Sequence, residues 1–119
     1  MKLVLPGEFV TLNEYIQAER GNKFAASKIK REETDRVIWE CRIQKISVFT
    51  KPVKIVFTWY LKNAKKDPDN TAFSKKFILD GLVKAGILFN DNMEWIIGFE
   101  DQFKIDDKNP RVELKFLLR

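Results

Sequence analysis

The feature that most constrains the fold is a run from residue 53 to 61 in which every second residue is large and apolar. These residues are Val53, Ile55, Phe57, Trp59 and Leu61. Successive side chains of a β-strand point to opposite faces of a sheet, so a two-residue period predicts a strand with one buried face. Other parts of the chain must then form a layer that covers this face.

Two helices are predicted before this strand. Thr11 is followed three residues later by Glu14, a capping-box pattern that predicts a helix beginning at residue 12. Gly21 and Asn22 should end or kink that helix. A longer helix is predicted from about residue 24 to 45, because apolar residues and a threonine recur there at helical spacing. They are Thr34, Val37, Ile38 and Cys41.

The rest of the chain adds a helix and three strands. A strand is predicted within residues 1–10, a helix from about Thr71 to Ala85, and a left-handed residue at Gly86. Strands at 95–105 and 112–118 are separated by turn-forming residues 106–110, which favours an antiparallel hairpin. We therefore expect one α+β domain over residues 1–119, a mixed sheet with helices packed on one face. The predicted order is strand, helix, strand, helix, strand, strand.

Composition excludes several kinds of chemistry. The chain of 119 residues has no histidine and one cysteine, so histidine catalysis, histidine-bound zinc and an internal disulfide are excluded. Cys41 is expected to be a buried filler. No apolar run approaches the ~20 residues of a membrane span, and Pro6 interrupts the opening apolar residues, so we expect a cytoplasmic protein. A domain of this size buries itself only marginally, which makes pairing with a second copy unsurprising.

Positive charge is concentrated in two places. The chain carries 22 Lys and Arg against 17 Asp and Glu, a net charge of +5 that permits binding to a polyanion. The 20–31 basic group contains no acid and consists of Arg20, Lys23, Lys28, Lys30 and Arg31. The 62–66 basic group consists of Lys62, Lys65 and Lys66. Both are candidates for phosphate contacts, and the 20–31 group could equally be a solvated helix face.

Carboxylates gather around the start of the 71–85 helix. Asp67 precedes a proline and is biased to extended backbone, so Asp69, two residues later, should point the same way. On a helical wheel Asp69, Lys76 and Asp80 share one stripe between two apolar flanks, and Lys76 can pair with Asp80. We expect the narrower flank, Leu79 and Val83, to face another subunit.

A third carboxylate follows the helix. The apolar residues 87–89 should carry the chain back along the core, so that Asp91 arrives beside Asp67 and Asp69. Three carboxylates near lysines would suit magnesium-dependent phosphodiester hydrolysis. Simpler explanations exist: Asp69 and Asn70 could cap the helix, Asp67 could serve a turn, and Lys76–Asp80 could be a surface pair.

These residues together resemble the signature of the RusA family of Holliday junction resolvases. The matching segments are Asp67-Pro68-Asp69-Asn70, Lys76, Asp80-Gly81-Leu82, Lys84-Ala85-Gly86 and Asn90-Asp91. Leu5-Pro6 and the region of Asn13 and Tyr15 are also similar to the start of that family. The resemblance extends over most of the chain, and its specific part is residues 67–91.

The resemblance implies a homodimeric crossover junction endodeoxyribonuclease of DNA recombination and repair. It would bind four-way or other branched DNA and nick two symmetry-related strands. Asp67, Asp69 and Asp91 would hold Mg²⁺, for which Mn²⁺ could substitute, and Lys76 would be the catalytic lysine. Asp80 and Asn70 would be supporting residues. Such a protein would associate with the nucleoid through DNA, and the resemblance is compatible with a phage or prophage origin.

Two positions depart from the family pattern, and two other functions compete. Lys76 follows Asn70 by six positions where the family has three, so Lys75 or Lys66 could take its place. The closing pair is Asn90-Asp91 rather than Asp-Asp. One alternative is a branched-DNA-binding protein without catalysis. The other is a phosphatase of the haloacid dehalogenase type, whose Asp-x-Asp-x-Thr motif fits residues 67–71. In those enzymes the motif follows directly on a buried strand, whereas Ala64-Lys65-Lys66 precedes it in this chain.

Overall fold

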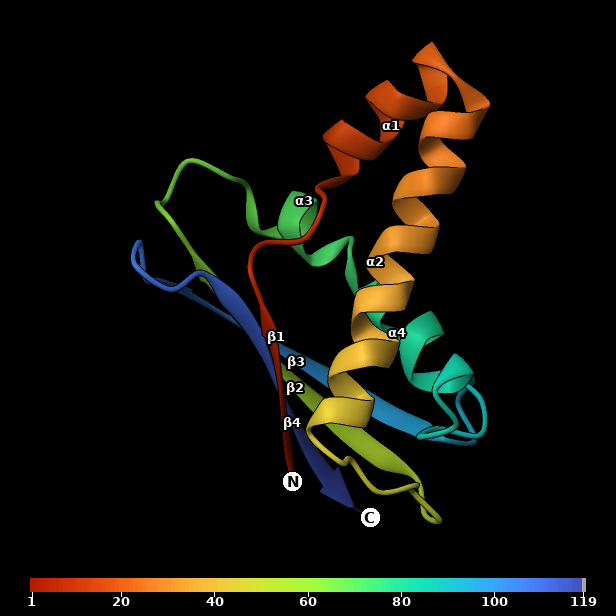
Figure 1. The fold of residues 1–119 in the computed structure, drawn as a ribbon. Helices are drawn as coiled ribbons and strands as arrows, with labels where there is room; N and C mark the ends of the chain where they lie inside the picture. Colours follow the sequence, from red (N-terminus) through yellow and green to blue (C-terminus); the bar gives the residue numbers. More distant parts are fainter. Residues whose placement is uncertain (119) are drawn as a thin grey trace.

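A computed structural model describes residues 1–118 as one α+β unit, with a mixed four-stranded sheet and its helices on one side (Figure 1). In chain order the elements are β1 (Lys2–Pro6), α1 (Leu12–Gly21), α2 (Lys23–Ile43), β2 (Val53–Leu61), α3 (Pro68–Ala72), α4 (Lys75–Lys84), β3 (Ile96–Ile105) and β4 (Arg111–Leu118). The predicted fold class is confirmed. α1 and α2 correspond to the two helices predicted before the 53–61 strand, which the predicted order counts as one, whereas two helices stand where a single 71–85 helix is predicted.

The sheet differs from the prediction in how its last two strands pair. Its order is β1-β4-β2-β3, so β4 lies antiparallel between β1 and β2, while β3 runs parallel to β2 at the edge. The predicted hairpin between 95–105 and 112–118 is therefore wrong. The turn-rich connection 106–110 crosses the end of β2 instead, where the amide of Asp106 donates to the carbonyl of Leu61 at 2.8 Å. The central position buries Val112, Leu114 and Phe116 of β4.

The core lies between the helices and one face of the sheet. All five alternating residues of β2 are buried, as the two-residue period predicts. From α2, Thr34, Val37 and Cys41 are buried on the predicted face. Burial raises the pKa of the Cys41 thiol to about 11, which keeps it protonated and unreactive at neutral pH, in agreement with a filler role.

The two flanks of α4 both face the interior. Leu79 is buried in the main core, and Val83 packs against that core. The expectation that this narrower flank faces another subunit is therefore wrong. On the opposite side of α4, Gly81 lets the side chain of Val37 in α2 come up against the helix backbone.

The predicted 71–85 helix is divided at Phe73 and Ser74 into α3 and α4. Ser74 is fully buried, and its hydroxyl donates to the carbonyl of Val10, a distant part of the chain. The amides of Ser74 and Phe77 bond three residues back rather than four, which tightens this turn. Asp69 therefore belongs to a different helix from Lys76 and Asp80, and the predicted common stripe is interrupted.

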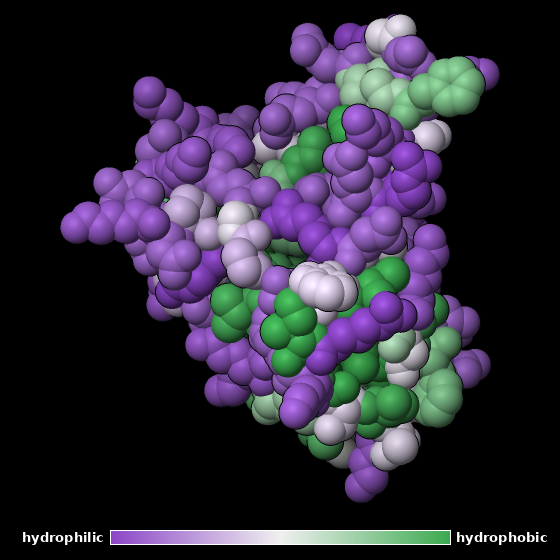
Figure 2. All heavy atoms as spheres, viewed as in Figure 1, coloured by the Kyte–Doolittle hydropathy of each residue, from purple (hydrophilic) through white to green (hydrophobic). Residues whose placement is uncertain are grey.

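The two ends of the helical face differ in polarity. Figure 2 shows hydrophobic residues over the lower part of this face and mostly hydrophilic residues over the upper part. Exposed apolar residues near the end of α2 and just after it include Trp39, Ile43 and Val48. Within the described residues no helix has the length and apolar character needed to cross a membrane.

Candidate functional site

The paired aspartates lie where the chain leaves β2 and enters α3. Asp67 is the residue before the helix, in extended backbone with φ −72° and ψ 140°, and Pro68 occupies the first helical position. This geometry fits the bias that a following proline imposes. The Asp67 side chain makes no capping hydrogen bond, and the Asp69 carboxylate accepts one from the amide of Asn70 at 2.9 Å. Asp69 and Asn70 lie inside α3, whose N-cap residue is Asp67, so the explanation that Asp69 and Asn70 cap the helix does not hold.

Both carboxylates are exposed, and neither forms an ion pair within residues 1–118. Asn70 anchors the segment that carries them, because its side-chain oxygen accepts a hydrogen bond from the amide of Asn13 at 2.9 Å. α3 is thereby fixed to the start of α1. Two free carboxylates on an anchored turn are available to a cation or to water.

Lys76, the lysine expected to be catalytic, is in contact with an aspartate. Lys76 pairs with Asp80 at 3.7 Å, as their spacing predicts, while its side chain stays 64% exposed. Lys75 is held differently: its ammonium lies 2.7 Å from Asp101 and 4.6 Å from the centre of the Phe99 ring. Of the two neighbouring lysines, Lys76 is therefore the one with freedom to reach a bound phosphate.

Asp91 is not brought to the other two aspartates within one chain. It lies between α4 and β3, the segment that precedes the amino end of β3, whereas Asp67 follows the carboxyl end of β2. Since β2 and β3 run parallel and are nine and ten residues long, these are opposite ends of strands roughly 30 Å in length (Figure 1). Among residues 1–118, no group of three or more carboxylate or thiol side chains is close enough to hold a metal ion. The predicted convergence is thus not found in the single chain.

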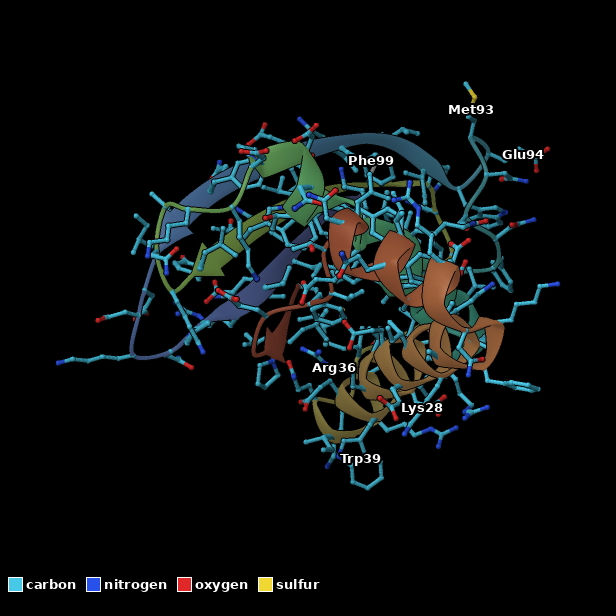
Figure 3. The ribbon with its side chains drawn as sticks, turned by 90° about the horizontal axis from the view of Figure 1, so that it is seen from above. Lys28, Arg36, Trp39, Met93, Glu94 and Phe99 are labelled. Atoms are coloured by element: carbon cyan, nitrogen blue, oxygen red, sulfur yellow. The ribbon has the colours of Figure 1, made fainter. Side chains whose placement is uncertain are left out.

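Both basic groups lie at the same end of the molecule as α3. The 20–31 group spans the junction of α1 and α2 at the top of Figure 1, and the 62–66 group forms the loop leading to α3. Lys28 points outward from α2 (Figure 3) and makes only a 3.8 Å surface pair with Glu32. Exposed pairs of this kind contribute little to stability, so the lysine can exchange Glu32 for a phosphate.

Lys66, a member of the 62–66 group, is paired with Glu8, an acid outside the sequence motifs described above. Glu8 accepts from the Lys66 ammonium at 2.8 Å and from the Lys62 amide at 2.8 Å. Burial raises the pKa of Glu8, but the hydrogen bonds and charges of these lysines outweigh it and hold that pKa below its usual value. Lys66 is therefore occupied in holding the loop, which leaves Lys62 and Lys65 for phosphate contacts.

Asp101 is a second residue whose role the sequence did not reveal. Its carboxylate accepts the indole N–H of Trp59 at 2.9 Å and the Lys75 ammonium at 2.7 Å. The sequence feature that could have indicated this role is the position of Asp101 as the single acid on the otherwise apolar face of β3. Because Lys75 is paired with Asp101, it is not free to take the place of Lys76 as the sequence suggested.

No protein-family profile matches the chain, and no curated protein matches it. Function must therefore be inferred from the residues and their arrangement.

Proposed function

We propose that this protein is a magnesium-dependent endodeoxyribonuclease that resolves four-way DNA junctions by paired symmetric nicks, in DNA recombination and repair. The observation that carries the proposal is the pair Asp67 and Asp69, which are exposed and form no ion pair among residues 1–118, at the end of the molecule where both basic groups lie. Lys and Arg side chains at that end would bind DNA phosphates, and their proximity would bring a phosphodiester to the two carboxylates. The resemblance of residues 67–91 to RusA resolvases supports the same reaction.

The donor set fits a hard divalent cation. Mg²⁺ prefers oxygen ligands and is commonly held by one or two carboxylates together with waters and substrate phosphates. Asp67 and Asp69 would hold it, and when bound it supplies polarisation of a phosphate oxygen. Lys76, exposed and only loosely paired with Asp80, would neutralise charge that develops on the phosphate. Mn²⁺, which also takes oxygen ligands, would substitute.

Paired nicking requires two sites related by symmetry. A four-way junction has two-fold symmetric strands, so an enzyme that cuts both would act as a homodimer with one site per subunit. In the cell such a protein would be found in the cytoplasm on DNA.

The decisive experiment compares a labelled four-way junction with a linear duplex of the same arm sequence, each in Mg²⁺ and in EDTA. We expect symmetric nicks in the junction alone, and only with the metal. Asp69→Asn should abolish cutting without weakening junction binding. Asp107→Asn, an exposed aspartate in the connection after β3, is the matched control and should cut as wild type does.

The basic groups are tested by salt dependence. Replacing Lys23 and Lys30 with alanine should lower junction affinity and reduce the slope of log K against log salt by about 1 for each lost phosphate contact. If the junction is bound but never cut in Mg²⁺ or Mn²⁺, catalysis by these aspartates is wrong.

That outcome would support a second candidate, a branched-DNA-binding protein without catalysis. The observation in its favour is the separation of Asp91 from Asp67 and Asp69 within one chain. The phosphatase alternative has less support, since residues 62–66 separate β2 from the Asp-x-Asp motif and the sheet contains a single parallel pair. Hydrolysis of p-nitrophenyl phosphate without any cutting of DNA would favour it.

A further inference from the structure

The junction of α1 and α2 is a corner held by a single residue. Asn22 ends α1, where its amide donates to the carbonyl of Ala18 at 2.9 Å. The same residue begins α2, where its side-chain oxygen accepts from the amide of Phe24 at 2.7 Å. α1 has no buried residue, so the corner adds little to the core, and it stands away from the sheet (Figure 1). The backbone that carries Phe24 is therefore fixed although it lies at the surface.

Phe24 places a large apolar ring on this corner. Its side chain is 82% exposed, and among residues 1–118 it stacks on no other aromatic ring. Figure 2 shows hydrophobic atoms at the tip of the corner, within a mostly hydrophilic upper part. Single exposed apolar residues are common, but this one lies inside the 20–31 basic group, whose members are all exposed. An aromatic ring among cations is the combination with which proteins stack on bases while they hold phosphates.

The basic groups by themselves cannot distinguish branched DNA from linear DNA. Lys and Arg side chains bind phosphates, which every duplex arm presents in the same way. Inside a duplex, an inserted side chain must first separate two stacked base pairs. At the centre of an open four-way junction, each base pair has a neighbour on one side only, so a ring can lie against it without that cost. A residue that stacks on a base would therefore favour the branched substrate.

The corner can contact the same DNA as the two aspartates. The amide of Asn13, at the start of α1, donates to the side chain of Asn70 at 2.9 Å, which places that start beside the turn carrying Asp67 and Asp69. α1 has 10 residues, so its far end lies roughly 15 Å away at about 1.5 Å per residue. That distance corresponds to about four or five base pairs at about 3.4 Å each. One DNA molecule can thus reach both places.

We infer that Phe24 stacks on a base at the branch point of four-way DNA, while Arg20, Lys23 and Lys28 bind the neighbouring phosphates. Lys28 already points outward from α2 (Figure 3). The inference rests on the proposed function, and it adds the residue that selects branched over linear DNA. Because Phe24 is remote from the carboxylates, its loss weakens this selection and leaves the metal ligands in place.

The first test is binding in EDTA, where a magnesium-dependent enzyme cannot cut. Fluorescence anisotropy compares a labelled junction with a linear duplex of the same arm sequence. Phe24→Ala should weaken junction binding between about fivefold and about a hundredfold, the range expected for one lost stacking contact, and should leave duplex binding unchanged. The slope of log K against log salt should remain that of wild type, because no phosphate contact is lost. Phe24→Trp should keep the preference for the junction.

Trp39→Ala is the matched control. Trp39 is an aromatic residue of the same helix with 62% exposure, roughly 22 Å further along α2 and outside the 20–31 basic group. This variant should bind both DNAs as wild type does, and equal thermal melting would show that both alanine variants fold. An equal loss of junction and duplex affinity in Phe24→Ala, or a loss of selection in Trp39→Ala alone, would overturn the inference.

The contact itself is tested by photocross-linking. A 5-iodouracil at the branch point should cross-link to the peptide that contains Phe24, identified by mass spectrometry, because the excited base reacts with an aromatic ring stacked on it. The same base in the middle of an arm should not. Cross-linking of Phe24 from the arm position alone would refute stacking at the branch point.

The outcomes separate this inference from the proposed function. If wild type prefers and cuts the junction while Phe24→Ala keeps that preference, the role of Phe24 is refuted and the nuclease proposal stands. If wild type selects the junction through Phe24 but never cuts it in Mg²⁺ or Mn²⁺, the proposed catalysis is wrong and the role of Phe24 stands. A wild type that binds junction and duplex equally would refute both.

Discussion

Replacing Gly81 with alanine should destabilise the protein, although the same change strengthens most helices. An alanine Cβ at this position would lie 2.6 Å from Val37 Cβ, 2.7 Å from Val37 Cγ1 and 3.1 Å from the carbonyl oxygen of Thr34. Carbon atoms pack at about 3.5–4.0 Å. Because Val37 is fully buried and its Cβ is attached directly to α2, a change of rotamer cannot relieve the contact. α2 and α4 would have to move apart by about 1 Å.

Two opposing terms set the magnitude. Alanine gains about 1 kcal/mol over glycine in helix propensity, and overpacking a core costs about 1–3 kcal/mol. With a clash this severe we take the upper end, which gives a net loss of about 2 kcal/mol and a fall in Tm of roughly 8 °C, at about 4 °C per kcal/mol for a chain of this size.

Urea unfolding followed by tryptophan fluorescence measures this free energy directly. The control is Gly21→Ala at the end of α1, where a Cβ would have no neighbour within 4 Å. That variant should be as stable as wild type or slightly more stable. If Gly81→Ala were also neutral or stabilising, the close α2–α4 packing described above would be wrong.

Three further predictions concern single side chains. Thr11→Ala removes the hydroxyl that accepts from the Glu14 amide and donates to the Glu14 carboxylate, while the Thr11 amide can still donate to Glu14. It should lower the free energy of unfolding by about 1 kcal/mol, measured by urea denaturation. Asp101→Ala leaves the Trp59 indole and the Lys75 ammonium without their acceptor and should lower it by about 1–3 kcal/mol; an unchanged Tm would refute this role. Glu8 has a folded-state pKa below its ordinary 4.5, so its contribution is present above that value and is lost as the pH falls through the folded-state pKa. In Glu8→Gln the loss of stability between about pH 6 and pH 3 should therefore be smaller than in wild type, which acid titration of the thermal melt would measure.

The features that could be predicted from the sequence depend on spacing within a few residues. The alternation in β2 requires only that side chains point to opposite faces, and the structure buries every second residue. Thr11 and Glu14 form both capping bonds, and Gly86 takes a positive φ of 78°, as expected at the end of a helix. Lys76 meets Asp80 because residues four apart in a helix are neighbours.

The features that could not be predicted depend on residues far apart in the chain. Turn residues 106–110 suit a hairpin locally, but β4 pairs with β1 and β2, and Val112, Leu114 and Phe116 are buried in that position. α3 and α4 separate because Ser74 bonds to Val10, and Lys75 is held by Asp101; neither partner can be recognised from its own neighbourhood in the sequence.

For the candidate site, the sequence by itself determined the chemistry: oxygen ligands without histidine, two aspartates around a proline, and basic groups on either side. Only the tertiary structure decided the arrangement. It brought the basic groups to the end that carries Asp67 and Asp69, and it left Asp91 at the other end of the strands. The physical reason is that residue types fix what a side chain can bind, whereas the direction and order of β2 and β3 fix which side chains can meet.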